Sequence, residues 1–184
     1  MRIIAGKYRG SVLSDVGEGD VAAHLRPTSD RVRESLFSML THHDVIIGAR
    51  VLDLFAGTGA LGLEALSRGA KDVCFVENGR VAQRLITQNI EKLRAKAEAT
   101  LMRNDATSLG AWIAAPFDLV LLDPPYGKGM GQLALTAVRD GGWLAPDAMI
   151  VWEENAPMNA PHGFKRIDKR KYGDTHMTLL RRTV

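Results

Sequence analysis

The chain has 184 residues, of which 46% are hydrophobic and 24% are charged. These are the proportions of a soluble globular protein, and the length suffices to bury a substantial core, so we expect one domain over residues 1–184. The net charge of +3 excludes a strongly acidic or strongly basic chain, so the placement of the charges matters more than their sum.

The first 44 residues predict an extension that precedes the repeating part of the chain. Residues 2–5 and 11–14 are compatible with a short hairpin, and residues 15–24 predict a mobile loop because they combine glycines and acids without periodicity. A helix is expected from near Thr28 to residue 40, since Val32, Leu36 and Leu40 recur at helical spacing. We therefore expect residues 1–44 to form a β/helix extension and residues 45–184 to form the core.

Residues 51–154 alternate short β-rich runs with helical patterns, which indicates an α/β fold with a largely parallel sheet. Residues 164–171 and 175–182 predict an antiparallel hairpin that turns at Tyr172, Gly173 and Asp174. The expected strands cover residues 51–55, 71–77, 99–105, 117–123 and 148–154, and the expected helices cover residues 60–68, 81–96, 106–113 and 130–140.

A glycine-rich turn, GTGALG (57–62), follows the first strand and opens a helix. Gly57 and Gly59 would let the backbone approach a ligand closely, and the helix N-terminus offers free N–H groups. Glu77 ends the next strand, 20 residues after Gly57, where a carboxylate accepts hydrogen bonds from ribose hydroxyls. The pattern predicts a nucleoside cofactor, and by itself it fits NAD as well as S-adenosylmethionine.

Two further acids favour S-adenosylmethionine. Asp53 lies within the first strand, where a carboxylate suits the cationic amino-acid end of that cofactor and would repel a dinucleotide's pyrophosphate. Asp105 ends the third strand, where it could accept a hydrogen bond from an adenine amine. Either acid alone could equally be a solvated turn or a helix cap.

The residues Asp123, Pro124, Pro125 and Tyr126 follow the apolar run FDLVLL. They stand at the carboxyl end of a strand, where open α/β sheets bind ligands. Proline fixes φ and offers a carbonyl without a competing N–H, so the segment is a stiff corner with acceptors and a flat ring. Asp123, expected to be ionised, and the Pro124 carbonyl could hold the two N–H bonds of a nucleobase amine while Tyr126 stacks on the base. An ordinary Pro-Pro turn is the alternative.

Both ends of the chain are basic. Residues 1–10 hold three basic residues and no acid, and residues 165–182 hold seven against two acids. Such clusters are typical of nucleic-acid contacts, although solvated surface charge is the commoner explanation. The candidates are Lys7, Arg9, Lys169, Arg170 and Lys171.

Cell location and metal binding are predicted mainly by what the sequence lacks. The first ten residues resemble no export signal, and no apolar stretch approaches membrane-spanning length. The single cysteine, Cys74, is expected to be a small core residue and can form no intramolecular disulfide, which fits a reducing compartment. The five histidines show no metal-ligand spacing. We expect a cytoplasmic, monomeric protein with no metal and no membrane partner.

Residues 51–70 resemble motif I of class I S-adenosylmethionine-dependent methyltransferases, and residues 123–126 resemble the (Asp/Asn)-Pro-Pro-(Tyr/Phe/Trp) motif of their amino-methylating branch. The segments RIIAGKYRG (2–10), RPTSDRVRESLFSML (26–40) and RKYGDT (170–175) are similar to the bacterial 16S ribosomal RNA guanine-966 N2-methyltransferase family. These three segments are more specific than motif I, which very many methyltransferases share.

The resemblance implies a Rossmann-like class I methyltransferase fold with a seven-stranded, mostly parallel sheet and an antiparallel C-terminal strand. It implies methyl transfer from S-adenosylmethionine to a guanine of 16S rRNA, in the small ribosomal subunit or an assembly intermediate. Arg26, Thr28 and Arg33 are expected to border the active site. The residues expected to bind the cofactor are Asp53, Phe55, Gly57, Thr58, Gly59, Glu77, Asn78, Asp105 and Ala106.

Other functions stay open at this point. An NAD(P)-dependent oxidoreductase would explain GTGALG and Glu77, but not the corner at 123–126. A methyltransferase acting on the N6 amine of adenine in DNA would use the same corner. A binding module without turnover would have no need of the acceptors at Asp123 and Pro124.

Overall fold

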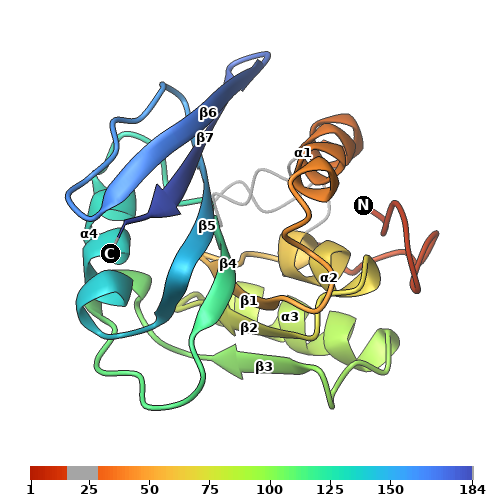
Figure 1. Ribbon diagram of the computed structural model, residues 1–184. Helices are drawn as coiled ribbons and strands as arrows, with labels where there is room; N and C mark the ends of the chain where they lie inside the picture. Colours follow the sequence, from red (N-terminus) through yellow and green to blue (C-terminus); the bar gives the residue numbers. More distant parts are fainter. Residues whose placement is uncertain (16–28, 184) are drawn as a thin grey trace.

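A computed structural model describes residues 1–15 and 29–183 of the chain (Figure 1). The loop predicted over residues 15–24 lies outside the described residues except for Asp15. The predicted helix start near Thr28, and the predicted site residues Arg26 and Thr28, lie outside them as well.

A seven-stranded sheet forms the centre of the described chain, in the order β3-β2-β1-β4-β5-β7-β6. The first five strands are parallel to one another, and β7 runs antiparallel between β5 and β6. This confirms the predicted fold class. The strands are Arg50–Leu54 (β1), Asp72–Val76 (β2), Ala99–Met102 (β3), Phe117–Leu122 (β4), Leu144–Glu154 (β5), Phe164–Tyr172 (β6) and Thr175–Arg182 (β7).

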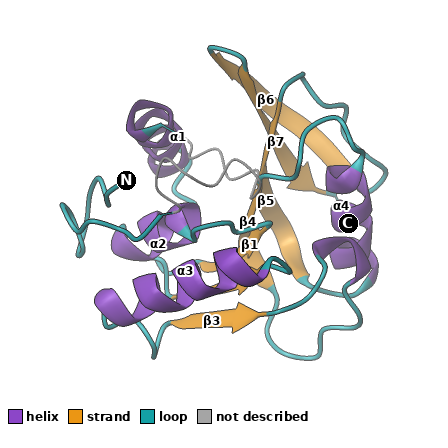
Figure 2. Cartoon of the chain, turned by 180° about the vertical axis from the view of Figure 1, so that it is seen from behind, coloured by secondary structure: helices purple, strands orange, loops and turns teal. Residues whose placement is uncertain are grey.

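Helices cover both faces of the sheet (Figures 1 and 2). The helices Asp30–His42 (α1), Ala60–Ser67 (α2) and Arg80–Lys92 (α3) pack on one face, and Met130–Asp140 (α4) packs on the other. Because side chains alternate along a strand, each strand contributes to both cores: Val51 faces the first three helices, while Leu52 faces α4. Burial on two faces explains why the central strands are continuous apolar runs.

Apart from the helix expected over residues 106–113, the strands and helices predicted over residues 51–182 are present, and the largest differences lie near residues 106–116 and 144. A 3-10 turn over Ala106–Ser108 replaces the helix expected over residues 106–113. The following loop is held by tertiary contacts: the Trp112 amide donates to the Gly141 carbonyl at 2.8 Å, and its indole stacks on Trp143 at 4.4 Å between ring centroids. β5 begins at Leu144 rather than residue 148, because it continues through a register shift against β4.

The N-terminal segment forms a short, irregular hairpin. Its two arms share one bridge, between Arg2 and Val12. The segment is held mainly against α2, because the amides of Ile4 and Ala5 donate to the buried carboxylate of Glu64 at 2.8 and 3.1 Å. Within the described residues, no helix is long and apolar enough to cross a membrane.

Candidate active site

Three carboxylates gather at the carboxyl edge of the central strands. β4 lies between β1 and β5, and its residues Leu121 and Leu122 pair with Asp53 and Leu54 on one side and with Val151 and Trp152 on the other. One step beyond these pairs come Asp123 and Glu153. Because successive side chains alternate between faces, Asp53, Asp123 and Glu153 all point to the face covered by α2 and α3.

Asp53 is 1% exposed, and its Oδ2 accepts a hydrogen bond from the Gly62 amide at 2.8 Å. Burial raises the pKa of Asp53 to about 8, and the nearby charge of Glu77 acts in the same direction. The carboxyl group is therefore mostly protonated at neutral pH. A cation bound beside it would favour the ionised form and draw the pKa down.

Asp123 and Tyr126 share their surroundings with Glu153, which the sequence did not single out. The Tyr126 hydroxyl donates to Glu153 Oε1 at 2.7 Å, which fixes the ring at the corner. Burial raises the pKa of Asp123 well above its usual range, and the neighbouring carboxylates of Glu153, Asp53 and Glu154 raise it further. Asp123 was expected to be an ordinary ionised aspartate. Instead it shares a low-dielectric site with other acids, so a proton is readily retained among them.

Glu154 fixes the backbone that follows the corner. Its carboxylate, 5% exposed, accepts hydrogen bonds from the amides of Gly127 at 3.0 Å and Asn155 at 2.9 Å. These two bonds hold the loop after Tyr126 against the end of β5. Like Glu153, Glu154 was not a predicted site residue, because nothing in the sequence states that β5 lies next to β4.

The glycine-rich turn has the backbone geometry its sequence predicts. Gly57 and Gly59 have φ of 57° and 77°, a left-handed conformation that glycine adopts without strain. Phe55, just before the turn, has φ of 57°, which is strained for a bulky residue and marks the loop as tightly constrained. Glu77 braces the turn, because its carboxylate accepts from the amides of Gly57 at 2.9 Å and Gly79 at 2.7 Å.

Asn89, on α3, is a second brace that the sequence did not reveal. Its side chain is fully buried and donates to the carbonyl of Thr58, within the glycine-rich turn, at 3.0 Å. The same amide group donates to the Ser14 carbonyl and accepts from the Ser14 amide at 2.7 Å. One asparagine thereby connects the N-terminal segment to the turn.

The remaining predicted cofactor residues lie at the ends of β2 and β3. Asn78 is exposed after β2, and Ala106 is buried after β3. Asp105 caps the 3-10 turn, where its Oδ1 accepts from the Thr107 amide and hydroxyl at 2.8 and 2.7 Å. Those two hydrogen bonds lower the pKa of Asp105, so it is ionised at neutral pH.

The basic hairpin adjoins the corner. Glu153 and Glu154 pair with Met177 and His176 of β7, so the turn between β6 and β7 extends just past the end of β5. The predicted RNA residues Lys169, Arg170 and Lys171 are exposed on β6, the outer strand of the sheet. Arg170 also forms an ion pair with Asp168 at 2.9 Å.

Three other predicted RNA residues are not brought to this edge. Lys7 pairs with Glu98, just before β3, at 3.1 Å, and its amide donates to the last residue of α2. Both contacts lie at the amino end of the strands, opposite the corner, and exposed Arg9 belongs to the same turn. Arg33 is fully buried and contacts Asp30, the Arg2 carbonyl and Glu64. A direct contact of Arg33 with RNA does not fit this burial; the residue fastens α1 to α2 and the N-terminal segment.

The arrangement as a whole defines the class of protein. The fold and the site are those of a class I methyltransferase. The sheet is parallel with an antiparallel seventh strand, a glycine-rich turn follows the first strand, and a Pro-Pro corner follows the fourth. The sequence matches the family described as Conserved hypothetical protein 95 over residues 1–181, and the chain belongs to this family. Within the described residues, no group of His, Cys, Asp and Glu is arranged to hold a metal ion.

The chain is similar to several named relatives and solved structures. It is 38% identical to ribosomal RNA small subunit methyltransferase D of Escherichia coli K12 over 161 residues, which are 88% of this chain and 78% of that protein. The protein of the same name from Haemophilus influenzae is 34% identical over 181 residues, covering 94% of this chain and 89% of its own. A solved structure described as "Putative methyltransferase yhhF" from Escherichia coli is 35% identical, with a TM-score of 0.83 over 99% of this chain and 97% of that one.

Proposed function

We propose that this protein transfers a methyl group from S-adenosylmethionine to the exocyclic N2 amine of a guanine in 16S rRNA, at the position the family resemblance gives as guanine 966. The relatives named ribosomal RNA small subunit methyltransferase D support the RNA class. The observation that carries the chemistry is the corner at Asp123 and Pro124, held beside the glycine-rich turn and backed by Glu153.

The residues at the sheet edge fit the cofactor. S-adenosylmethionine carries a sulfonium and an ammonium, and when bound it supplies an electrophilic methyl group. Asp53, once ionised beside a cation, and Glu77 would stabilise a positive charge near the turn, and neither offers a partner to the pyrophosphate of NAD. Gly57 and Gly59 leave room for close backbone approach, and Asp105 offers an acceptor for the adenine amine. Carboxyl groups near the turn therefore favour the positively charged S-adenosylmethionine over a dinucleotide with its negatively charged pyrophosphate.

The corner supplies what the amine of guanine lacks. That amine is a poor nucleophile, because its lone pair is delocalised into the ring. An Asp123 carboxylate oxygen and the Pro124 carbonyl would accept its two N–H bonds and aim the lone pair, while Tyr126 stacks on the base. As the N–C bond forms, the bond between the methyl group and the sulfonium sulfur would break, with S-adenosylhomocysteine as the leaving group. The nitrogen loses one proton, which the site of Asp123 and Glu153 can retain. A base paired in a helix would first have to be unstacked.

The function is tested by nucleoside mass spectrometry of 16S rRNA from cells with and without this protein. We expect one N2-methylguanosine to disappear in the deletion and to return when the purified protein and S-adenosylmethionine are added to the unmethylated small subunits. An unchanged nucleoside profile would contradict the proposed function. Thermal-shift titration with S-adenosylhomocysteine and with NADH separates the methyltransferase from the oxidoreductase, since only the first should stabilise the protein.

The exposed charges on β6 should contribute to RNA affinity. Replacing Lys169, Arg170 and Lys171 with glutamate should weaken binding to small ribosomal subunits and flatten its salt dependence, because each phosphate contact contributes about 0.7–0.9 to the slope of log K against log salt. Filter binding between about 50 and 200 mM salt measures both quantities. Affinity and slope equal to those of the parent protein would show that this strand is solvated surface only.

Binding of the cofactor should release a proton from Asp53. Its pKa of about 8 leaves the group mostly protonated at pH 7, and pairing with an ammonium requires the ionised form. Affinity for S-adenosylhomocysteine should therefore rise as pH increases towards 8. Calorimetry at pH 7 in two buffers of different ionisation enthalpy measures the released proton. Asp53→Asn should abolish the release, and an equal release from that variant would assign the proton to another group.

A further inference from the structure

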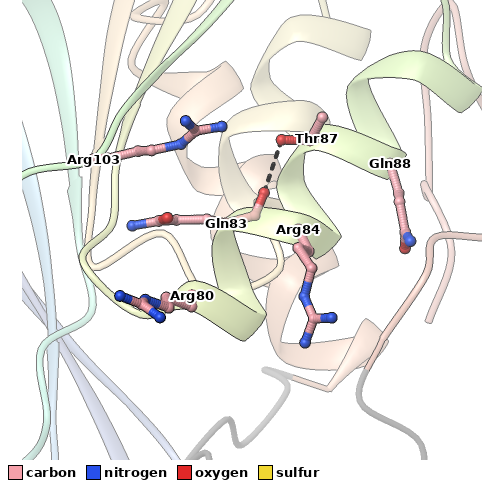
Figure 3. A pocket seen from close by; sticks show the side chains of 6 residues that line it. All are labelled: Arg80, Gln83, Arg84, Thr87, Gln88 and Arg103. Carbon is pink, nitrogen blue, oxygen red and sulfur yellow. Dashed lines mark hydrogen bonds between the residues drawn. The ribbon is translucent and has the colours of Figure 1, made fainter.

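An open pocket of about 650 Å³ lies along α3 (Figure 3). Five of its lining residues come from α3, and Arg103 follows the end of β3. No residue expected to bind the cofactor or the guanine lines it. The lining residues are Arg80, Gln83, Arg84, Thr87, Gln88 and Arg103.

The described lining is polar and positively charged. Arg80, Arg84 and Arg103 are exposed, and among the described residues none of the three has a carboxylate within ion-pair distance. The guanidinium group carries forked N–H donors that match the oxygens of a phosphate. Three such groups line this one open pocket.

The wall of the pocket is held in place by its own hydrogen bonds. Gln83 Nε2 donates to the Glu77 carbonyl at 2.9 Å. The Thr87 hydroxyl donates to the Gln83 carbonyl at 2.8 Å (Figure 3). The first bond joins the pocket to the end of β2, next to the expected cofactor site. An anion held there would therefore lie near the edge where the chemistry is proposed to occur.

The order of the strands explains why a second cationic surface is needed. β3 and β6 are the two outer strands, and the corner that follows β4 lies between them. The edge between them holds the carboxyl groups of Asp53, Asp123 and Glu153, which offer a phosphate no positively charged partner. Lys169, Arg170 and Lys171 can hold a backbone on the β6 side, whereas the arginines of α3 are placed to hold it on the β3 side.

We propose that the pocket formed by Arg80, Arg84 and Arg103 binds backbone phosphates of the substrate RNA. The inference rests on the proposed function for the identity of the RNA. Phosphate contacts position a nucleic acid without reading its sequence. The pocket and the basic strand β6 thus hold the RNA backbone on the two sides of the carboxyl edge of the sheet, and the target base is directed to Asp123.

The test replaces all three arginines with glutamine and measures binding to unmethylated small ribosomal subunits at several salt concentrations. We expect the slope of log K against log salt to fall by about two to three, since about 0.7–0.9 is lost per phosphate. Affinity at the lowest salt should fall by more than tenfold. Binding of S-adenosylhomocysteine should stay at the parent value, which separates loss of RNA contacts from damage to the fold or to the cofactor site.

Two further variants complete the experiment. The control variant removes the same amount of charge at the amino edge of the strands, by Lys71→Gln, Arg94→Gln and Lys96→Gln together. It should keep the parent slope of log K against log salt. Replacing the three pocket arginines with lysine keeps the charge and should restore most of the slope. A glutamine variant that binds subunits like the control overturns the proposal, as does a parent protein that binds no subunits. If the arginines govern binding while no N2-methylguanosine depends on the protein, only the proposed reaction falls.

Discussion

Asp123→Ala should lower methyl transfer to unmethylated small subunits by a factor of about 10²–10³ or more, the effect of removing one preorganised group that stabilises developing charge. The amine would lose one of its two acceptors and the developing ammonium its nearest carboxylate. Binding of S-adenosylhomocysteine should be retained, because its proposed contacts lie in the glycine-rich turn and at Glu77. Single-turnover kinetics and calorimetry measure the two quantities separately.

Stability provides an internal control for this variant. The pKa of Asp123 is raised because of burial and the charges of Glu153, Asp53 and Glu154. The ionised carboxylate therefore destabilises the folded protein at pH 8. The alanine variant should unfold at the parent temperature or above it at pH 8, even though turnover is lost. Tyr126→Phe keeps the ring and loses the hydroxyl with its hydrogen bond to Glu153, so the loss of turnover should be much smaller than in Asp123→Ala. Turnover near the parent value in Asp123→Ala would refute the role assigned to the carboxylate.

The fold and the centre of the site were predictable because their signals are local. Alternating β-rich and helical patterns gave the α/β class, and the glycine-rich turn was recognisable from residues 57–62 alone. The corner at 123–126 was recognisable because proline restricts the backbone wherever it lies. Each of these features depends on neighbours in the chain rather than on packing between distant segments.

Glu153 and Glu154 could not be assigned in this way. They end an apolar strand, as many solvated acids do, and only the position of β5 beside β4 places them against Asp123 and Tyr126. The raised pKa of Asp123 has the same origin, because the charges responsible come from other strands. Sheet order is a property of the whole chain, so local sequence patterns could not predict which acids would lie beside Asp123.

Arg33 shows the converse. The family resemblance implies that Arg33 borders the active site, and an arginine in a helix with a polar face is normally exposed. The structure buries it beside Glu64, itself fully buried within the apolar helix α2. Glu64 also accepts from the N-terminal amides of Ile4 and Ala5, so two buried charges fasten three segments together. No pattern within either helix indicated the partner.

Gly62→Ala should destabilise the protein, although alanine ordinarily favours a helix by about 1 kcal/mol over glycine. A Cβ at this position would lie 2.5 Å from Phe75 Cε1, 2.7 Å from Val73 Cγ2 and 2.9 Å from Asp53 Oδ2. These neighbours are at most 1% exposed, so they cannot move into solvent, and overpacking of a core typically costs about 1–3 kcal/mol. With contacts on three sides, the steric cost should exceed the helical gain.

The expected result is a melting temperature several degrees lower, at about 2–4 °C per kcal/mol for a chain of this size, together with weaker cofactor binding. Both follow from one displacement, because the Gly62 amide donates to Asp53 and the two residues must separate to admit a methyl group. Gly110→Ala is the matched control, since a Cβ there meets nothing within 4 Å and its φ is not positive. If the two variants melt together and bind S-adenosylhomocysteine alike, the third glycine of the turn is not required for packing. Unfolding followed by circular dichroism, with calorimetry on both variants, decides between these outcomes.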